Sequence, residues 1–331
     1  MSVMPQQHLA PVTAAGLLAT DWCPAQCRHC YESAGPGGTR WMTVDAAAGH
    51  LAALARLGAA AEGIHIGGGE PFGDFDRLLA IVRAARQAGL AGIGYVETNA
   101  FWATDADDVR RRLAALAQAG MMQISISADP YHQEFVPPER VRLLYEAARD
   151  VLGPAGVRAR RWKWLHAPRD VAAMPEHGRM ELFREFLARY PERMTSRCAE
   201  RLSALAERVP ADALPADGCR AALLEAGHVH IDPDGWVYPG TCAGIVLGRA
   251  APEQPLDRLL AAWHPADSPL VAALAEGGPR RLAQAAAGHG FAPDAAGYAG
   301  KCHLCWRVRR HLVRAGAGGP ALQPPQLYLT F

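Results

Sequence analysis

Apolar residues recur at every third or fourth position between residues 43 and 57, a pattern that predicts an amphipathic helix with Thr43 as its N-cap and Gly58 just beyond its end. Two further helices of this kind end at Gly89 and Gly120. The three glycines are 31 residues apart, which is the length of one strand-plus-helix unit. Short apolar strands are expected after each helix, at residues 63–66, 93–96 and 123–127.

Strands that alternate with helices predict a parallel sheet. The third helix is expected to begin after Thr104, with Asp107 completing a variant of the capping box. Polar clusters occupy the ends of the strands, at residues 67–70, 97–99 and 127–129. In a β/α barrel these ends share one face, and that face holds the chemistry. The alternative is that these loops are simply polar and rich in glycine.

The second half of the chain is less regular. A strand is predicted over residues 157–164, helices over 175–188 and 196–208, and a hairpin over 228–238 with its turn at 232–235. The tail, residues 315–331, contains Gly, Pro and Gln and is predicted to be a surface extension. We place a boundary between residues 190 and 217.

Composition predicts a soluble globular protein, because half of the 331 residues are hydrophobic and a fifth are charged. The 34 Lys and Arg nearly balance the 33 Asp and Glu, so a net charge near +1 gives no electrostatic reason to bind nucleic acid or an anionic membrane. No run of 18 apolar residues exists, and no basic segment precedes Arg28. We therefore expect a cytoplasmic protein with no nucleic-acid partner, no membrane partner and no signal peptide.

Eight cysteines are the most informative feature of the sequence. The reducing cytosol disfavours disulfides, so metal binding or catalysis is the better explanation. Cys23, Cys27 and Cys30 lie within eight residues, and three thiolates can bind a [4Fe-4S] cluster while leaving one iron without a protein ligand. The alternative is a zinc site of three cysteines and His29, although this spacing is unusual for zinc.

The run CPAQCRHC resembles the CxxxCxxC signature of the radical SAM superfamily, which follows the first barrel strand. The resemblance extends over residues 14–165. Residues 67–71 read GGGEP, similar to the family's GGE motif after the second strand. Thr98 and Asn99 follow the third strand, and Ser125, Ser127 and Asp129 lie on or after the fourth.

The resemblance implies that S-adenosylmethionine binds the open iron through its amine and carboxylate. The reduced cluster would then cleave it to methionine and a 5′-deoxyadenosyl radical, which abstracts hydrogen from an unactivated carbon. By the same resemblance, Gly68, Gly69 and Glu70 would hold the methionine amine and His29 would flank the adenine. Cofactor roles are also implied for Thr98, Asn99, Ser125, Ser127 and Asp129, although each of these residues has an ordinary turn role as its alternative.

A second group of cysteines comprises Cys219, Cys242, Cys302 and Cys305. Four thiolates can fully ligate a second [4Fe-4S] cluster, and the alternative is structural zinc. A zinc ribbon has two CxxC pairs, whereas here there is one pair, and 59 residues separate it from Cys242. The arrangement resembles the Twitch/SPASM auxiliary-cluster domains that follow some radical SAM barrels. Cys198 belongs to neither group and is predicted to be a small buried residue. The alternative is that its thiol faces the substrate.

The combined resemblance implies a partial (β/α)6 TIM-type barrel and a small C-terminal auxiliary-cluster domain that contains the β-hairpin. We assign residues 1–200 to the barrel, 201–314 to the Twitch/SPASM-like domain and 315–331 to a C-terminal extension. The cofactors implied are S-adenosylmethionine, a [4Fe-4S] cluster that binds it and a second, auxiliary [4Fe-4S] cluster. A low-potential electron donor such as flavodoxin or ferredoxin would be the protein partner.

An auxiliary cluster in this family implies that the substrate radical is oxidised after hydrogen abstraction. Such an oxidation releases a proton, and Tyr131, His132 and Glu134 are the candidate acceptors after the fourth strand; polar loop residues are the alternative. The resemblance favours maturation of a ribosomally made peptide by family frequency alone. The alternatives are dehydrogenation of an aminocyclitol or sugar and, in another class, a non-catalytic zinc or iron–sulfur scaffold or electron carrier.

Overall fold

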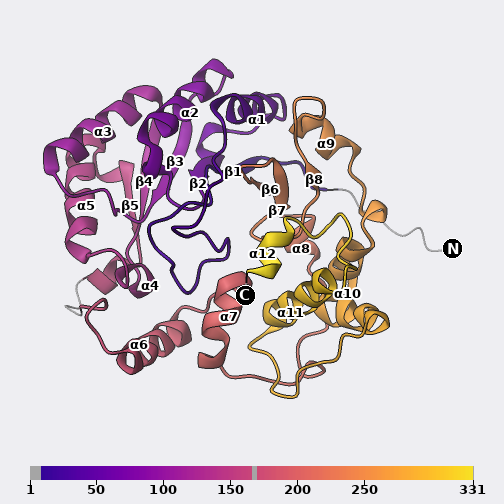
Figure 1. The fold of residues 1–331 in the computed structure, drawn as a ribbon. Coiled ribbons are helices and arrows are strands. Elements are labelled where there is room, and N and C mark those ends of the chain that lie inside the picture. The colour runs from indigo at the N-terminus through magenta and orange to yellow at the C-terminus, as the bar shows by residue number, and fades with distance from the viewer. Residues whose placement is uncertain (1–8, 166–169, 331) are drawn as a thin grey trace.

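The fold is that of a computed structural model, which describes residues 9–165 and 170–330. The first half consists of strands and helices that alternate as the 31-residue spacing predicts. Its strands are β1 (Ala14–Leu18), β2 (Ile64–Gly67), β3 (Ile93–Thr98), β4 (Met121–Ser127) and β5 (Val157–Arg160). Its helices are α1 (Val44–Arg56), α2 (Phe75–Gln87), α3 (Ala106–Ala119), α4 (Pro130–Gln133) and α5 (Pro138–Leu152). Figure 1 shows α1, α2, α3 and α5 as an outer arc around the strands.

The second half is mainly helical and contains a β-hairpin. Its helices are α6 (Glu176–Arg189), α7 (Ser196–Leu202), α8 (Arg220–Leu223), α9 (Leu256–Ala262), α10 (Pro269–Ala286), α11 (Lys301–Arg314) and α12 (Pro325–Leu329). Its strands are β6 (His228–Ile231), β7 (Trp236–Pro239) and β8 (Gly248–Arg249). Helix α10 is kinked at Gly278, which has φ of 62° and is followed by Pro279.

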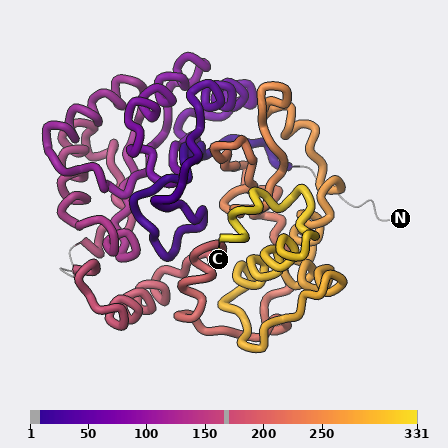
Figure 2. Tube along the Cα trace, in the orientation of Figure 1, coloured from indigo at the N-terminus to yellow at the C-terminus, as the bar shows by residue number. Residues whose placement is uncertain are grey.

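All eight strands form one sheet, in the order β5-β4-β3-β2-β1-β6-β7-β8. Strands β1 to β5 are parallel to their neighbours, which confirms the predicted α/β class with a parallel core. The sixth parallel strand is β6, the first arm of the predicted hairpin. In the sheet it lies beside β1, at the opposite side from β5. The sheet is not closed. Figure 2 follows the chain from the indigo first strand to the orange hairpin that returns beside it.

Three sequence expectations need local correction. Helix α3 is capped by Asp105, whose side chain accepts a hydrogen bond from the Asp108 amide, and not by Thr104. The strand expected over 157–164 ends at Arg160, because Arg161 has φ of 63° and a 3₁₀ turn follows over Trp162–Leu165. The Thr43 cap of α1 is confirmed, since its side chain accepts from the Ala46 amide.

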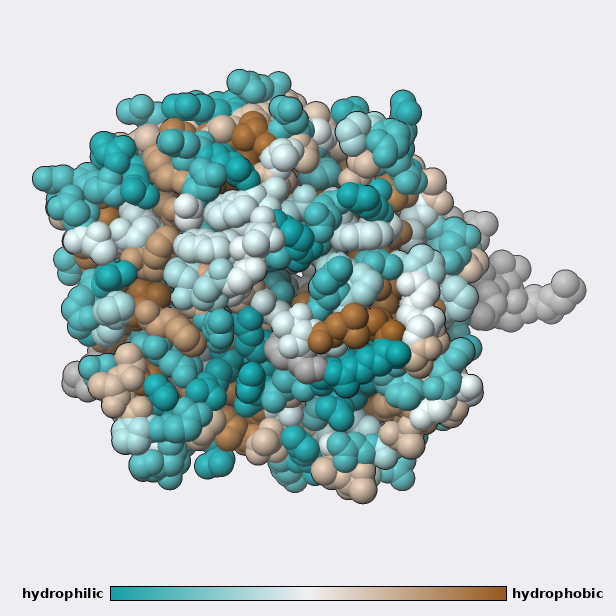
Figure 3. Space-filling view, in the orientation of Figure 1, coloured by the Kyte–Doolittle hydropathy of each residue, from teal (hydrophilic) through white to brown (hydrophobic). Residues whose placement is uncertain are grey.

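The tail is packed into the protein and is not the surface extension predicted from its composition. Tyr328 on α12 is fully buried and stacks on Trp306 of α11 with ring centroids 5.0 Å apart. Its hydroxyl receives a hydrogen bond from Arg309 at 2.7 Å. Apolar residues on the face in Figure 3 form small separate patches on a mostly hydrophilic surface.

Candidate active site

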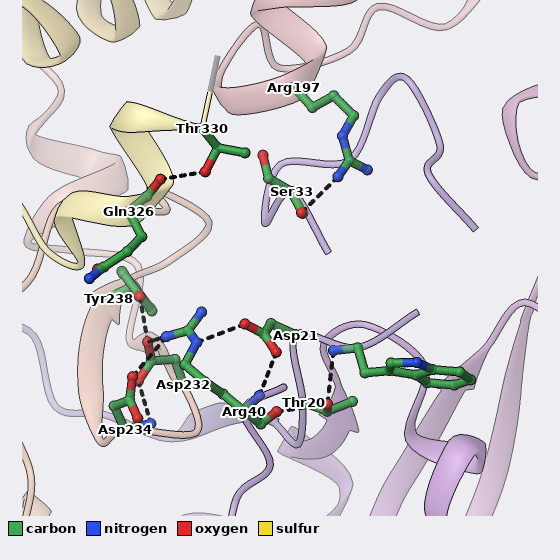
Figure 4. Close-up of polar contacts among 11 residues, drawn as sticks. Thr20, Asp21, Ser33, Arg40, Arg197, Asp232, Asp234, Tyr238, Gln326 and Thr330 are labelled. Carbon is green, nitrogen blue, oxygen red and sulfur yellow. Dashed lines mark hydrogen bonds and ion pairs between the residues drawn. The ribbon is translucent and has the colours of Figure 1, made fainter. Parts of the chain in front are cut away.

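The loop that carries the first three cysteines is tied to the hairpin through Arg40 (Figure 4). The Arg40 guanidinium donates to Asp21 at 2.7 Å within the loop and to Asp234 at 2.8 Å in the hairpin turn. Asp232 lies 3.5 Å from the same guanidinium and accepts a hydrogen bond from the Tyr238 hydroxyl at 2.9 Å. Since β6 pairs with β1, the loop after β1 is braced by the strand beside it.

Helix α7 braces the other side of this loop. Arg197 donates to the Ser33 carbonyl at 2.7 Å and to the Cys27 carbonyl at 3.4 Å. Figure 4 shows Arg197 reaching down to Ser33. These backbone contacts fix the loop where three cysteines converge.

Cys23, Cys27 and Cys30 line one cavity of about 280 Å³ at the carboxyl ends of the strands. Cys23 and Cys27 are buried and Cys30 is half-buried. Burial is the main cause that raises the pKa of Cys23 to about 12, and it also raises the pKa of Cys27 and Cys30 above the usual value. Thiols in this position ionise only when a cation stabilises the thiolates, which is what a metal centre provides.

The GGGEP segment packs against the cysteine loop. A side chain on Gly69 would place its Cβ 2.0 Å from the Trp22 carbonyl oxygen, and one on Gly68 would lie 2.7 Å from the Thr20 carbonyl oxygen. Gly68 also has φ of 106°, which favours glycine. Gly68 and Gly69 both line the cavity, as their predicted cofactor role requires.

Glu70 is fully buried behind the cavity wall and joins the loops after β2 and β3. Its carboxylate accepts hydrogen bonds from the Asn99 amide at 2.7 Å, the Thr98 hydroxyl at 2.9 Å and the Phe72 amide at 3.2 Å. Burial, opposed by these hydrogen bonds, raises the pKa of Glu70 to about 7. Thr98 and Asn99 line the cavity, and the Asn99 amide donates to the Cys23 sulfur at 3.4 Å.

His29 forms part of the cavity wall and stacks on Tyr131 with ring centroids 4.7 Å apart. Its Nδ1 atom is buried without a hydrogen-bond partner among the described residues. Burial lowers the pKa of His29 to about 4, so the ring is neutral. A neutral ring in the cavity wall with one unused nitrogen fits a role beside a bound cofactor.

The three predicted proton acceptors lie in different environments. His132 lines the cavity, and its Nδ1 lies 2.7 Å from the Asp129 carboxylate. Burial alone would raise the pKa of Asp129, but His132 and His29 together hold it below the usual range. Glu134 is instead paired with Arg28 at 2.9 Å, and Tyr131 is fully buried beneath His29.

Of the two serines predicted on β4, Ser127 lines the cavity. Ser125 lies deeper in the barrel, where Arg158 donates to its hydroxyl at 3.3 Å. Asp129 is the N-cap of α4 and accepts a hydrogen bond from the His132 amide at 3.1 Å. Its carboxylate therefore orients His132.

Two charged residues of the cavity, Glu192 and Arg193, were not predicted from the sequence, whereas Glu97 belongs to a polar cluster predicted at a strand end. Glu192 and Arg193 lie on the segment between α6 and α7, and Glu97 pairs with Arg160 at 3.2 Å across the barrel mouth. Burial is the main cause that raises the pKa of Glu192 to about 7, and Asp129 adds to it. Pro191, Glu192 and Arg193 form no motif, so only the fold brings them here.

The second group of cysteines also converges. Cys219, Cys242, Cys302 and Cys305 line one small cavity between α8, the end of the hairpin, α10 and α11. Burial raises the pKa of Cys305 to about 12 and that of Cys219 to about 11. Cys198 is not part of this set, since it is fully buried on α7 and its thiol lies 3.7 Å from the Met194 sulfur.

Two arginines lie at the second cavity. Arg309 is buried, and the thiols of Cys305 and Cys242 act with Tyr328 to raise its pKa against the effect of burial. Arg193 donates to the Cys242 sulfur at 3.6 Å. Positive charge beside four thiols favours their ionised form.

Residues 17–156 match the sequence profile of the radical SAM superfamily. This segment is a radical SAM domain. No curated protein sequence matches the chain. Among solved structures, the chain is similar to "Crystal structure of BtrN in complex with AdoMet and 2-DOIA", with 13% sequence identity, a TM-score of 0.48 and coverage of 81% of this chain and 88% of that chain. Within the described residues, none of the helices is long and apolar enough to cross a bilayer.

The donor sets fit the iron–sulfur groups that a radical SAM domain uses. Cys23, Cys27 and Cys30 supply three thiols around a cavity that also holds the unpartnered Nδ1 of His29. When bound, a [4Fe-4S] cluster and S-adenosylmethionine would supply a carbon radical for hydrogen abstraction. The four cysteines of the second cavity match the ligand number of a fully coordinated cluster.

Proposed function

We propose that this chain is a radical SAM oxidoreductase that holds two [4Fe-4S] clusters and oxidises a small polar substrate between them. The observation that carries the proposal is the convergence of Cys219, Cys242, Cys302 and Cys305 on one cavity, separate from the first three cysteines. Arg193 lines both cavities, so the two cavities are neighbours that share this residue in their walls. That proximity suits electron transfer from substrate to the second cluster.

The chain's own residues would position the cofactor and exclude water. Gly68 and Gly69 leave the cavity wall open for close approach, and His29 offers a neutral ring and one unused nitrogen. Asn99 orients the Cys23 sulfur. Glu70 acts behind them, because its three hydrogen bonds hold the loops that carry these groups.

Glu192 is the best-placed acceptor for the proton that oxidation releases. It lines the cavity, and burial brings its pKa to about 7, near the pH at which a general base works best. His132 lies across the same cavity with Asp129 holding its other face. Tyr131 and Glu134 have structural contacts that take them away from the cavity.

The charged groups that line the cavity favour a substrate with amino or hydroxyl groups. Its wall carries the carboxylates of Glu97 and Glu192 and the guanidinium groups of Arg160 and Arg193. Such groups hydrogen-bond to polar substituents and suit a sugar or aminocyclitol. A ribosomally made peptide is the competing substrate class in the test.

The test is anaerobic reconstitution of the full chain with iron and sulfide, followed by reductant and S-adenosylmethionine. We expect about eight irons per chain, release of 5′-deoxyadenosine and turnover of a small aminated or hydroxylated substrate. Cys219→Ser with Cys302→Ser should lower the iron content to about four per chain and abolish oxidised product, while 5′-deoxyadenosine is still released. Cys198→Ala, a buried thiol outside both sets, is the control and should keep all three readouts.

Distinct outcomes contradict distinct parts of the proposal. Zinc in place of iron at all seven cysteines would overturn the enzyme assignment. Full oxidised product from the double variant would overturn the role of the second cluster. Oxidation of a peptide but of no small molecule would replace the substrate class and leave the rest intact.

A further inference from the structure

Three histidines from two strands converge inside the barrel, away from the cysteines. His65 lies on β2, and His228 and His230 lie on β6. One ring nitrogen from each lies within 4.8 Å of the other two. His65 and His230 are buried and His228 is half-buried. Because β2 and β6 lie on opposite sides of β1, the three rings meet across that strand.

The residue of β1 between them is Gly16, which pairs with His65 on one side and His230 on the other. A Cβ at Gly16 would lie 2.4 Å from the Cδ2 atom of His230 and 2.5 Å from the Nε2 atom of His65. Any side chain there would push the rings apart. Glycine is therefore the residue that lets both imidazoles occupy the space above β1.

The rings are oriented as metal ligands are. His230 Nδ1 lies 2.5 Å from the Gly240 carbonyl oxygen, so it donates its proton there and leaves the Nε2 lone pair free. His65 stacks flat on Tyr95, with ring centroids 4.7 Å apart and planes 2° apart. Among the described residues, the rings of His65 and His228 have no hydrogen-bond partner.

Burial, more than nearby charge, keeps the rings in the neutral form that binds metals. Burial, reinforced by the neighbouring histidines, lowers the pKa of His230 to about 4 and of His65 to about 2. Arg158 and Arg160 are the nearest cations, and they also lower the pKa of His65. Arg160 is paired with Glu97 at 3.2 Å, and Arg158 lies over the Tyr95 ring at 5.2 Å.

We propose that His65, His228 and His230 form a three-histidine site for one divalent transition metal ion, with Zn²⁺ as the favoured ion. Three neutral imidazoles suit zinc, which keeps a fourth position for water in sites of this kind. In a tetrahedral site with Zn–N bonds of about 2.1 Å the ligand nitrogens lie about 3.4 Å apart, so binding would draw the three rings closer than the 4.8 Å within which their nitrogens now lie. The ion would link β6 to β2 across β1, at a site whose three histidines line neither cysteine cavity.

The test uses the full chain after anaerobic reconstitution, so that iron occupies the cysteines before Zn²⁺ is added. We expect one tightly bound zinc per chain, with an X-ray absorption spectrum that shows only nitrogen or oxygen neighbours at about 2.0–2.1 Å and no sulfur at about 2.3 Å. Bound zinc should also raise the unfolding temperature of the protein, because it binds the folded state alone.

His65→Asn, His228→Asn and His230→Asn should each weaken zinc binding by more than about 100-fold, because even loss of a ligand's own partner costs about 10–100-fold. Each variant should also lose the zinc-dependent rise in unfolding temperature. His50→Asn is the matched control, since His50 is a buried histidine on α1 outside the cluster, and it should bind zinc as the wild type does. Circular dichroism shows whether each variant is folded.

Three results would overturn the proposal: no zinc bound to the reconstituted wild type, sulfur among the neighbours of the zinc, or folded histidine variants that keep wild-type zinc affinity. None of these results depends on the substrate or on turnover. Failure of this site and failure of the proposed oxidation can therefore be told apart.

Discussion

Arg193 donates a hydrogen bond to the sulfur of Cys242 at 3.6 Å, while the same residue lines the cavity that contains Cys23, Cys27 and Cys30. The charge that borders the first cavity thus contacts a thiol of the second, which we propose to be a cluster ligand. A cation and a hydrogen bond at a cluster sulfur both stabilise the reduced, more negative form.

Arg193→Met should therefore make the second cluster harder to reduce. We expect its midpoint potential to fall by about 60 mV, equivalent to a tenfold change in the equilibrium constant of a one-electron couple. Redox titration followed by electron paramagnetic resonance measures the shift. Arg193→Lys keeps the charge and should retain most of the wild-type potential. An unchanged potential in the Met variant would show that Arg193 does not act on this cluster.

Glu192 gives the reaction a predicted pH dependence. Because its pKa is raised to about 7, the basic carboxylate form grows as pH rises through 7, and product formation should rise with it. Glu192→Gln should lower turnover by about 10²–10⁴-fold and remove this rise. The measurement is product formation from pH 5.5 to 8.5. Glu207→Gln, which changes an exposed glutamate outside both cysteine cavities, is the control. A rise that persists in Glu192→Gln would assign the pH dependence to another group.

The contact of Gly69 with the Trp22 carbonyl predicts that this position tolerates no side chain. Gly69→Ala would force its Cβ to within 2.0 Å of that oxygen, so the loop must shift at a cost of about 1–3 kcal/mol. We expect loss of S-adenosylmethionine binding in equilibrium dialysis. Gly37→Ala lies in the same cysteine loop with open space around its Cβ and should bind normally. Equal affinity in the two variants would contradict this interpretation.

The buried tail predicts that residues near the C-terminus stabilise the fold. Tyr328→Ala removes a fully buried ring and should cost about 3–5 kcal/mol, as large aromatic truncations do. Leu329→Ala changes the next residue, which is 55% exposed, and should cost less than about 0.5 kcal/mol. Chemical denaturation of both variants measures the difference. Similar stabilities would mean that α12 adds little to the core.

The regular part of the fold could be predicted from the sequence because local signals set it. Gly120 ends α3 in the left-handed region with φ of 119°, and Thr43 caps α1, so turn chemistry alone marks these boundaries. The pairing of β6 with β1 carries no local signal. Residues 14–18 and 228–231 are more than 200 positions apart, and periodicity says nothing about partners at that distance.

The candidate site also has a part that the sequence predicts and a part that only the fold brings together. Cysteine spacing predicts two metal-binding sets, and the structure places the cysteines of each predicted set around one cavity. Glu192 was missed because a lone acidic residue in a connecting loop has no pattern. Glu70 could be found by its motif, but its environment could not, because two of its three hydrogen bonds come from the end of β3 and the loop after it, which the motif does not include.

The place of β6 in the sheet has a consequence for how the protein is made. During translation, the edge of β1 has no neighbour on that side until the ribosome has released residue 231, although β2 can pair on the other side much earlier. A nascent barrel with an open edge is prone to pair with the wrong strand. Contacts of such long sequence separation also form slowly. Maturation of the metal centres next to β1 therefore belongs after the hairpin has docked, when the loop that holds Cys23 gains its second wall.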